Sequence, residues 1–167
     1  MPKAWPSGIS IAMVDSEEVW KPHVTVAAII EKEQRFLLVR ERVDGREVLN
    51  QPAGHLDPNE TLEQAVIRET LEETSYPFQP RQLTGIYRYV PDPSNQQQSY
   101  LRFAFSGEVG ECLHQPLDRD IIRAEWMTLD EVKQSQDIHR SPMTLECILD
   151  YLQKPAYPLH IFSPSFL

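Results

Sequence analysis

A chain of 167 residues lies within the size range of one domain, and its 41% hydrophobic and 25% charged residues are ordinary values for a globular protein, which excludes a disordered or fibrous chain. A formal net charge of −9 opposes binding to nucleic acid polymers and anionic membranes, so a phosphate-bearing ligand needs local help from a metal ion or arginines. No apolar stretch has the length of a membrane span. We therefore predict a cytoplasmic protein in which Cys112 and Cys147 are reduced thiols.

The first third of the chain alternates between extended segments and breaks. Residues 1–20 show no clear period and predict an N-terminal extension with at most a short edge strand. Residues 23–30, HVTVAAII, and 35–42, RFLLVRER, predict two strands, and the polar EKEQ between them indicates a hairpin. Residues 47–60 predict a loop, because they contain Pro52, Gly54 and Pro58.

One long helix is predicted at residues 61–75, TLEQAVIRETLEETS, with Pro58-Asn59 marking its start and Ser75 its end. Strands are then predicted over 83–90, 99–109 and 121–129, helices over 129–136 and 141–154, and an irregular proline-rich tail after these. Strands on both sides of a central helix favour a layered α/β domain over a bundle or a β-sandwich.

The central helix carries acidic residues on an otherwise apolar stripe. At about 100° per residue, Glu69 and Glu73 continue the stripe of Leu62 and Val66, so neither carboxylate should be fully solvated. Ile67 and Leu71 lie on the opposite side and predict that the helix packs on two faces. The helix is therefore expected inside the domain.

Such an arrangement is costly without a ligand. Like charges four residues apart repel by a few tenths of a kcal/mol, and anions near a helix C-terminus oppose its dipole by a comparable amount, roughly 0.3 kcal/mol or more. Glu72 adds to both terms. Hard carboxylate oxygens are the ligands that Mg²⁺ prefers, so a bound cation would reverse the sign of the interaction. A solvated acidic face is the alternative, and Glu60 and Glu63 fit it better, with Glu60 a candidate partner for Arg68.

The charged residues match a known motif. Gly54, five residues, Glu60, seven residues and then Arg68-Glu69-x-x-Glu72-Glu73 resemble the Nudix box, which spans about twenty residues in a loop and the helix after it. Thr70 departs from the usual aliphatic residue, and Ser75 departs from the usual glycine. If Ser75 adopts a left-handed conformation, it carries a strain of about 1 kcal/mol that glycine would avoid.

Segments outside the box resemble the NudJ-type phosphatases of this family, from KPHVTVAAII at residue 21 to YPL near residue 160. The resemblance implies an α/β/α sandwich with a mixed β-sheet over residues 21–160, followed by a tail at 161–167. It implies a Mg²⁺ cofactor, with Mn²⁺ as a substitute, and hydrolysis of phosphoanhydride bonds in nucleoside di- and triphosphates or hydroxymethylpyrimidine diphosphate. The implied partner is thus a small phosphorylated molecule, and both a monomer and a homodimer stay open.

The resemblance also implies roles for the box residues. Glu69, Glu72 and Glu73 would be metal ligands, Gly54 a ligand through its carbonyl oxygen, and Arg68 would orient the carboxylates. The general base in this family often lies on a later loop, which makes Asp120 the candidate, with Asp118 next and Glu125 third. These acidic residues could equally decorate a loop or face solvent.

The predicted strands carry candidate substrate-binding residues. Arg40, Arg88 and Arg102 are candidates for phosphate oxygens, with surface ion pairs as the alternative. His23 and His55 flank motifs, but lone histidines are commonly structural. Several aromatic residues could stack on a ring or simply belong to the core: Tyr87, Tyr89, Tyr100 and Phe103.

Two other functions stay open. The first is a Nudix pyrophosphatase that acts on other nucleotide-linked substrates, because the box holds metal and phosphate while specificity lies elsewhere. The second is a catalytically silent Nudix domain that senses a nucleotide. The intact Glu69, Glu72 and Glu73 argue against the second.

Overall fold

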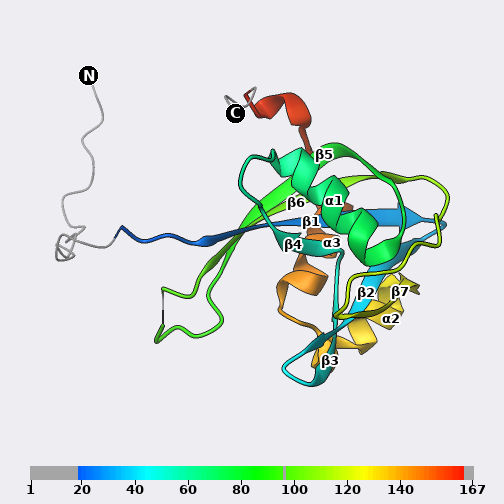
Figure 1. The fold of residues 1–167 in the computed structure, drawn as a ribbon, viewed down its shortest axis with the longest axis horizontal. Helices are drawn as coiled ribbons and strands as arrows, with labels where there is room; N and C mark the ends of the chain where they lie inside the picture. Colours follow the sequence, from blue (N-terminus) through cyan, green and yellow to red (C-terminus); the bar gives the residue numbers. More distant parts are fainter. Residues whose placement is uncertain (1–18, 96, 164–167) are drawn as a thin grey trace.

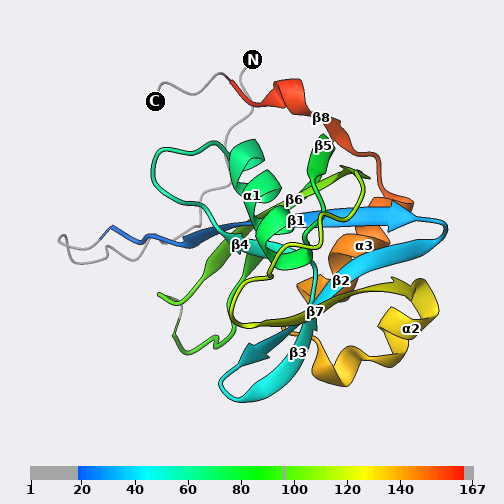
Figure 2. The same ribbon diagram turned by 45° about the vertical axis from the view of Figure 1, so that its right-hand side comes forward.

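The fold is a mixed sheet between helices. A computed structural model describes residues 19–95 and 97–163. The sheet has eight strands in the order β3-β2-β1-β6-β5-β8, with β4 added to β1 and β7 to β2. At its centre, β1 (His23–Lys32) and β6 (Tyr100–Val109) run parallel, from the His23–Tyr100 pair onward. The remaining pairings are antiparallel (Figures 1 and 2).

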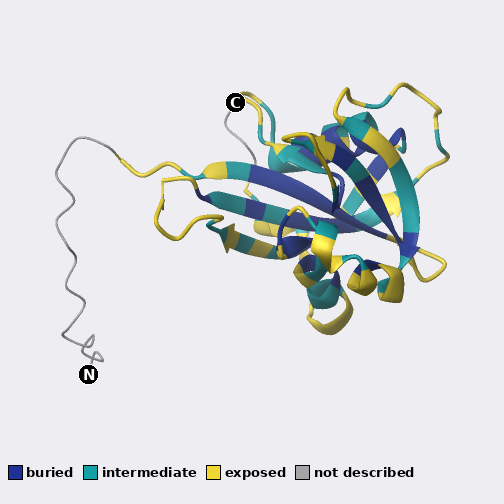
Figure 3. Cartoon of the chain, turned by 90° about the horizontal axis from the view of Figure 1, so that it is seen from below, coloured by how far each residue is buried: buried dark blue, intermediate teal, exposed yellow. Residues whose placement is uncertain are grey.

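Two apolar cores lie on opposite faces of this sheet. Val26, Ala28 and Ile30 of β1 pack in a cluster with helix α1 (Leu62–Thr74). Ile29 packs instead in the cluster that contains Ile148 of helix α3 (Met143–Gln153). The alternation follows from the two-residue period of a strand, and it makes β1 buried on both sides (Figure 3). The α/β/α sandwich with a mixed sheet is therefore confirmed.

The predicted hairpin is confirmed. Strand β2 (Arg35–Val43) returns antiparallel to β1, with Lys32 opposite Arg35. The two turn residues, Glu33 and Gln34, both have positive φ, at 52° and 60°. Positive φ at both central residues is the conformation of the tight hairpin turn whose twist matches that of the strands.

The loop predicted over 47–60 is partly wrong, because the structure has two short strands there. Strand β3 (Arg46–Asn50) pairs with β2, and β4 (Ala53–His55) pairs with β1. Pro52 separates them, and its carbonyl accepts from the N–H of Ala28. Proline lacks an N–H donor but keeps an acceptor, so it ended β3 without preventing the chain from pairing again.

Helix α1 lies where it was predicted, with its first helical residue, Leu62, one position after the predicted start. Thr61 is its N-cap and forms a capping box with Gln64, which satisfies exposed N–H groups of the first turn. The prediction of two packed faces was wrong, because Ile67 is 39% exposed. The buried face instead includes Glu69 and Glu73, at 8% and 7% exposure, which confirms that these carboxylates are shielded from solvent.

The remaining elements follow the predicted order. They are β5 (Phe78–Tyr89), β7 (Ile121–Thr128), α2 (Leu129–Gln134), a short 3₁₀ helix (Gln136–Ile138) and α3, then β8 (Tyr157–Pro158) and a final 3₁₀ turn (Leu159–Ile161). The tail is thus less irregular than predicted, because β8 pairs with β5. The predicted extension falls mostly on residues 1–18, outside the described residues. Among those described, no helix is long and apolar enough to cross a membrane.

Ser75 ends α1 in the predicted left-handed conformation, with φ at 62°. Its buried Oγ accepts a hydrogen bond of 2.7 Å from the N–H of Gln115, and its carbonyl accepts from Leu113. Serine therefore ties the segment before β7 to the end of the helix. That bond explains why serine is used at a position where glycine would be less strained.

We predict that Ser75→Gly does not stabilise the protein. Glycine removes about 1 kcal/mol of strain but leaves the Gln115 N–H without its acceptor, at a cost of about 1–3 kcal/mol. The free energy of unfolding, measured in urea, should be unchanged or lower by up to about 2 kcal/mol. Ser75→Ala keeps the strain and should lose more. A clear gain in stability for Ser75→Gly would contradict this account.

The two cysteines are free and differ in environment. Cys147 is fully buried, and burial raises the pKa of its thiol to about 11, whereas Cys112 is partly exposed. Because the thiolate is the reactive form, a thiol reagent at pH 8 should titrate Cys112 rapidly and Cys147 only after unfolding. Two fast thiols in the folded protein would contradict the packing of α3.

Candidate active site

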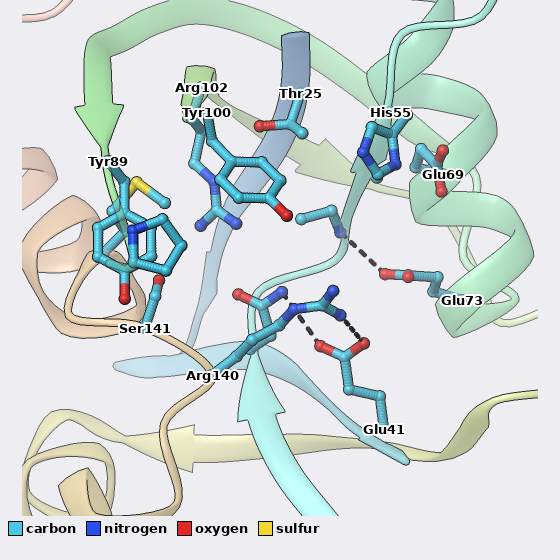
Figure 4. Close-up of a pocket in the computed structure, with 15 residues that line it drawn as sticks. Thr25, Glu41, His55, Glu69, Glu73, Tyr89, Tyr100, Arg102, Arg140 and Ser141 are labelled. Atoms are coloured by element: carbon cyan, nitrogen blue, oxygen red, sulfur yellow. Dashed lines mark hydrogen bonds and ion pairs between the residues drawn. The ribbon is translucent and has the colours of Figure 1, made fainter. Parts of the chain in front are cut away.

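One cavity of about 320 Å³ lies beside the carboxylate face of α1. Its walls come from the central strands β1 and β6, from β2 to β4, from α1, and from the segment that leads into α3 (Figure 4). Glu69 and Glu73 form one wall, and Arg102, Tyr89 and Ser141 lie on the other side. The cavity therefore joins an acidic wall to a basic and aromatic one.

The acidic wall depends on the close approach of β4 to α1. The N–H of Ala53 donates to Glu73 Oε2 at 2.8 Å. A Cβ at position 54 would lie 2.1 Å from Glu69 Cδ, so any larger residue there would displace the Glu69 carboxylate from its place in the wall. Gly54 thus has a steric role as well as the carbonyl ligand role that the motif implies.

Burial raises the pKa of both carboxyl groups. For Glu73, burial is the largest cause, and the charges of Glu41, Glu69 and Asp118 add to it. For Glu69, burial is again the largest cause, opposed by Arg68 and reinforced by Glu72 and Asp118. A divalent cation beside these oxygens would favour the ionised forms.

The donor chemistry of this wall fits a divalent cation. It offers shielded carboxylate oxygens that repel one another and a backbone carbonyl from Gly54, which are the hard ligands that Mg²⁺ and Mn²⁺ take. No group of three His, Cys, Asp or Glu side chains in the described part of the chain is already arranged around a common point. Two members of the acidic set, Glu69 and Glu72, accept hydrogen bonds from Arg68.

Arg68 connects the box residues through its guanidinium. It donates to both oxygens of Glu60, at 3.0 and 2.7 Å, to Glu69 Oε1 at 2.8 Å and to Glu72 Oε2 at 3.1 Å. It also donates to the carbonyl of His55 at 3.0 Å, which ties α1 to the end of β4. The predicted Glu60–Arg68 pair is therefore confirmed. Glu72 does not line the cavity, and its side chain is 41% exposed.

The candidate bases lie around a second hollow that shares Glu41 and Glu73 with the cavity. Asp118 and Asp120 both line it and are exposed. The charge of Asp118 acts on Glu69 and Glu73, and its N–H donates to the carbonyl of Glu72 at 3.0 Å. The carbonyl of Asp120 accepts from Arg42, so its backbone belongs to the edge of β2. The sequence placed Asp120 first, whereas Asp118 is the aspartate whose charge acts on the acidic wall.

Glu125, Arg40 and Arg88 are engaged elsewhere. Arg40 pairs with Glu125 and with Glu47, the latter at 3.0 Å, and none of the three lines the cavity. Burial opposes ionisation of Glu125, but its bonds to Arg40 and Arg123 outweigh burial and lower its pKa. The Arg88 guanidinium lies 5.2 Å from the Trp20 ring centroid. Of the three predicted arginines, only Arg102 reaches the cavity.

Sequence reasoning missed the pair formed by Glu41 and Arg140, which are 99 positions apart. Glu41 is 6% exposed, pairs with Arg140 and accepts from Asn50 Nδ2 at 3.2 Å. The period of β2 places Glu41 on the face of Leu37 and Val39, and this signal could have revealed a buried charge. Nothing local predicts its partner.

The aromatic and histidine candidates divide between site and core. Tyr89 and Tyr100 line the cavity, as does His55, whose pKa is lowered mainly by burial and then by His23. His23 stacks on Tyr100, with ring centroids 5.3 Å apart. In contrast, Tyr87 donates to Asp150 at 3.1 Å, and Phe103 packs with the core cluster of α1.

Three features together define the class of protein to which this chain belongs: the mixed sheet between helices, Gly54 beside α1, and the carboxylates bound by Arg68. The family model described as NUDIX domain matches residues 21–146. The chain therefore belongs to the Nudix family and is a Nudix phosphohydrolase. It is 39% identical to Phosphatase NudJ of Escherichia coli strain K12, over 86% of this chain and 92% of that protein.

Solved structures agree on the fold. A NUDIX hydrolase from Nitrosomonas europaea is 46% identical and superposes with a TM-score of 0.82, over 87% of this chain and 98% of that one. A UDP-X diphosphatase is 18% identical, with a TM-score of 0.66 over 82% of this chain and 66% of that one, which is a likeness of fold. The family inferred from the box is thus confirmed.

Proposed function

We propose that this phosphohydrolase uses Mg²⁺, with Mn²⁺ as a substitute, to cleave phosphoanhydride bonds of small organic diphosphates. Nucleoside di- and triphosphates and hydroxymethylpyrimidine diphosphate are the substrates we propose, in the cytoplasm. The observation that carries the proposal is the shielded pair Glu69 and Glu73 on a cavity wall, with a raised pKa at each. The identity to Phosphatase NudJ supports the phosphatase reaction.

The residues of the acidic wall would hold the metal. Glu69 and Glu73 supply oxygens at the cavity, Glu72 supplies a more distant one, and the Gly54 carbonyl adds a neutral ligand. A bound divalent ion supplies Lewis-acid charge for phosphoryl oxygens and lowers the pKa of a bound water. Arg68 positions the carboxylates, because its fork contacts Glu60, Glu69 and Glu72 together.

An acidic residue should take the proton of the attacking water. We place Asp118 ahead of Asp120 in this role, because the charge of Asp118 reaches both Glu69 and Glu73. Both aspartates lie on the hollow that adjoins the cavity through Glu73. Arg102, on the opposite wall, would donate hydrogen bonds to the substrate.

Product analysis on a panel of phosphorylated substrates tests the proposal. We expect orthophosphate to be released from diphosphates in the presence of Mg²⁺, with Mn²⁺ supporting a comparable reaction. Pyrophosphate plus a monophosphate, released from triphosphates alone, would favour the pyrophosphatase reaction instead. Tight nucleotide binding without any released phosphate would indicate that the protein is a nucleotide sensor and not an enzyme.

A further inference from the structure

Four residues that line the cavity each hold a buried polar atom without a hydrogen-bond partner. These atoms are Thr25 Oγ1, Asn50 Oδ1, Arg102 Nε and Ser141 Oγ. Within the described residues, only Thr84 Oγ1 shares this condition away from the cavity. Buried polar groups normally find partners, so their concentration on one cavity indicates that something else pairs with these side chains.

Arg102 is the most unusual of the four. Its side chain is buried, at 6% exposure, and no ion pair with it occurs among the described residues. Its Nη1 donates to Gln51 Oε1 at 3.2 Å, and Gln51 is in turn held by the carbonyl of Thr144 at 2.7 Å. The nearby Cys147 thiol stays neutral at pH 7, because burial raises its pKa to about 11. A buried guanidinium whose hydrogen-bond partners are the neutral Gln51 and Cys147, and not an anion, is prepared for a ligand.

The free atoms define what that ligand must offer. Asn50 donates through Nδ2 to Glu41, which fixes its Oδ1 as a free acceptor. Arg102 can only donate, and the hydroxyls of Thr25 and Ser141 can do either after a rotation about one bond. A matching group has acceptor atoms for the donors and at least one N–H or O–H donor for Asn50. A fully ionised phosphate has no such donor, whereas the edge of a nitrogen-containing ring offers both an acceptor and an N–H.

Shape points to a planar group of modest size. Tyr89 and Tyr100 border this side of the cavity, and Figure 4 shows the Arg102 guanidinium beside the Tyr100 ring, away from Glu69 and Glu73. Aromatic walls suit a flat ring. The volume of about 320 Å³ is at the small end of ligand cavities, which run from roughly 300 to 1,000 Å³. One ring with its diphosphate fits such a space better than a dinucleotide.

We propose that Thr25, Asn50, Arg102 and Ser141 form a head-group subsite, which binds a planar ring with an acceptor atom, either a ring nitrogen or a carbonyl oxygen, and an N–H on its edge. The ring would be the organic part of the diphosphate substrate, and the subsite would select against diphosphates whose organic part is a hydrocarbon. This inference rests on the proposed function, because it assumes that the diphosphate occupies the acidic wall. Arg102 is thereby a specificity residue and not a ligand of the reacting phosphate.

Binding of two non-hydrolysable analogues tests the subsite. The probes are the α,β-methylene diphosphates of uridine and of butanol, which share a diphosphate and differ in the head group. Calorimetry with Mg²⁺ present should give tighter binding of the uridine analogue. In Arg102→Met, the Kd of that analogue should rise by about 10- to 100-fold, the range for a lost polar contact in a buried site, while the Kd of the butyl analogue changes less than about twofold.

Two further variants sharpen the result. Thr25→Val keeps the side-chain shape and should raise the Kd of the uridine analogue by about fivefold while leaving that of the butyl analogue unchanged. This variant tests the subsite even if Arg102→Met folds poorly. Arg81→Met, which breaks an exposed pair with Glu108, is the matched control and should bind both analogues as the parent protein does.

Three results would overturn the subsite. Equal weakening of both analogues in Arg102→Met would place Arg102 on the diphosphate. Unchanged binding in both Arg102→Met and Thr25→Val would mean that the free atoms are satisfied by water. Equal binding of the two analogues by the parent protein would remove the selectivity itself. Because the analogues are not hydrolysed, these results are independent of the turnover assay that tests the proposed function.

Discussion

Glu73→Gln should lower kcat by about a hundredfold or more while the protein stays folded. Glu73 is shielded and lies at the cavity, and, unlike Glu69 and Glu72, it forms no ion pair with Arg68. Glutamine keeps the size and the acceptor for the Ala53 N–H but removes the charge. The loss corresponds to about 3 kcal/mol of electrostatic stabilisation, the scale seen when one such group is removed. Steady-state phosphate release at saturating Mg²⁺ measures it.

The same variant has a pH signature that controls for folding. Burial raises the pKa of Glu73 in the folded state above its ordinary value of 4.5, so the folded form holds this proton more tightly than the unfolded form. Stability of the metal-free parent should therefore decline as pH rises above about 4.5, toward the folded-state pKa. Glu73→Gln lacks this contribution and should be more stable than the parent at pH 8. Parent-like turnover, or a variant that unfolds more easily at pH 8, would contradict the assignment.

Arg68→Met should reduce kcat by about 10- to 100-fold, the usual cost of losing a residue that orients metal ligands. Without the guanidinium, Glu60, Glu69 and Glu72 lose their common partner, and α1 loses its bond to the His55 carbonyl. Arg68→Lys keeps the charge but cannot contact all three carboxylates at once. We therefore expect Arg68→Lys to lose about tenfold in kcat, with a changed Mg²⁺ concentration for half-maximal rate.

A purely structural role for Arg68 predicts a different result. Both variants would then unfold at a lower temperature but would keep the parent kcat and Mg²⁺ dependence well below that temperature. Measuring the Mg²⁺ dependence beside thermal unfolding separates the two cases. An unchanged kcat in Arg68→Met would remove Arg68 from the positioning role.

The box was predictable because its signal is local. Gly54, Glu60 and the charges of α1 are fixed by spacing along one loop and one helix, so their placement around Arg68 follows from helix geometry. The hairpin of β1 and β2 was predictable for the same reason, since its turn joins two contiguous apolar runs. The bounds of α1 were predicted to within one residue, because its caps, Thr61 and Ser75, are also local signals.

The rest of the site depends on pairings that are distant in the sequence. Arg40 and Arg102 share strand faces with Leu38 and Ala104, which pack in the same core cluster, so strand alternation does not separate the two arginines. Arg40 is instead engaged by Glu125 of the neighbouring strand β7. The buried charge of Glu41 is explained only by its ion pair with Arg140, which lies 99 positions later in the chain. The short strands β3 and β4 were missed because prolines mark breaks but do not reveal what the chain pairs with afterwards.

The most direct test of the account is phosphate release from a nucleoside diphosphate by the parent protein, before and after chelation of divalent metal. We expect orthophosphate release with Mg²⁺, its loss to the background rate with excess chelator, and its return when Mg²⁺ is restored. That result would connect the acidic wall of Glu69 and Glu73 to catalysis through a metal. Release that persists under chelation, or no release from any diphosphate with Mg²⁺ or Mn²⁺, would contradict it.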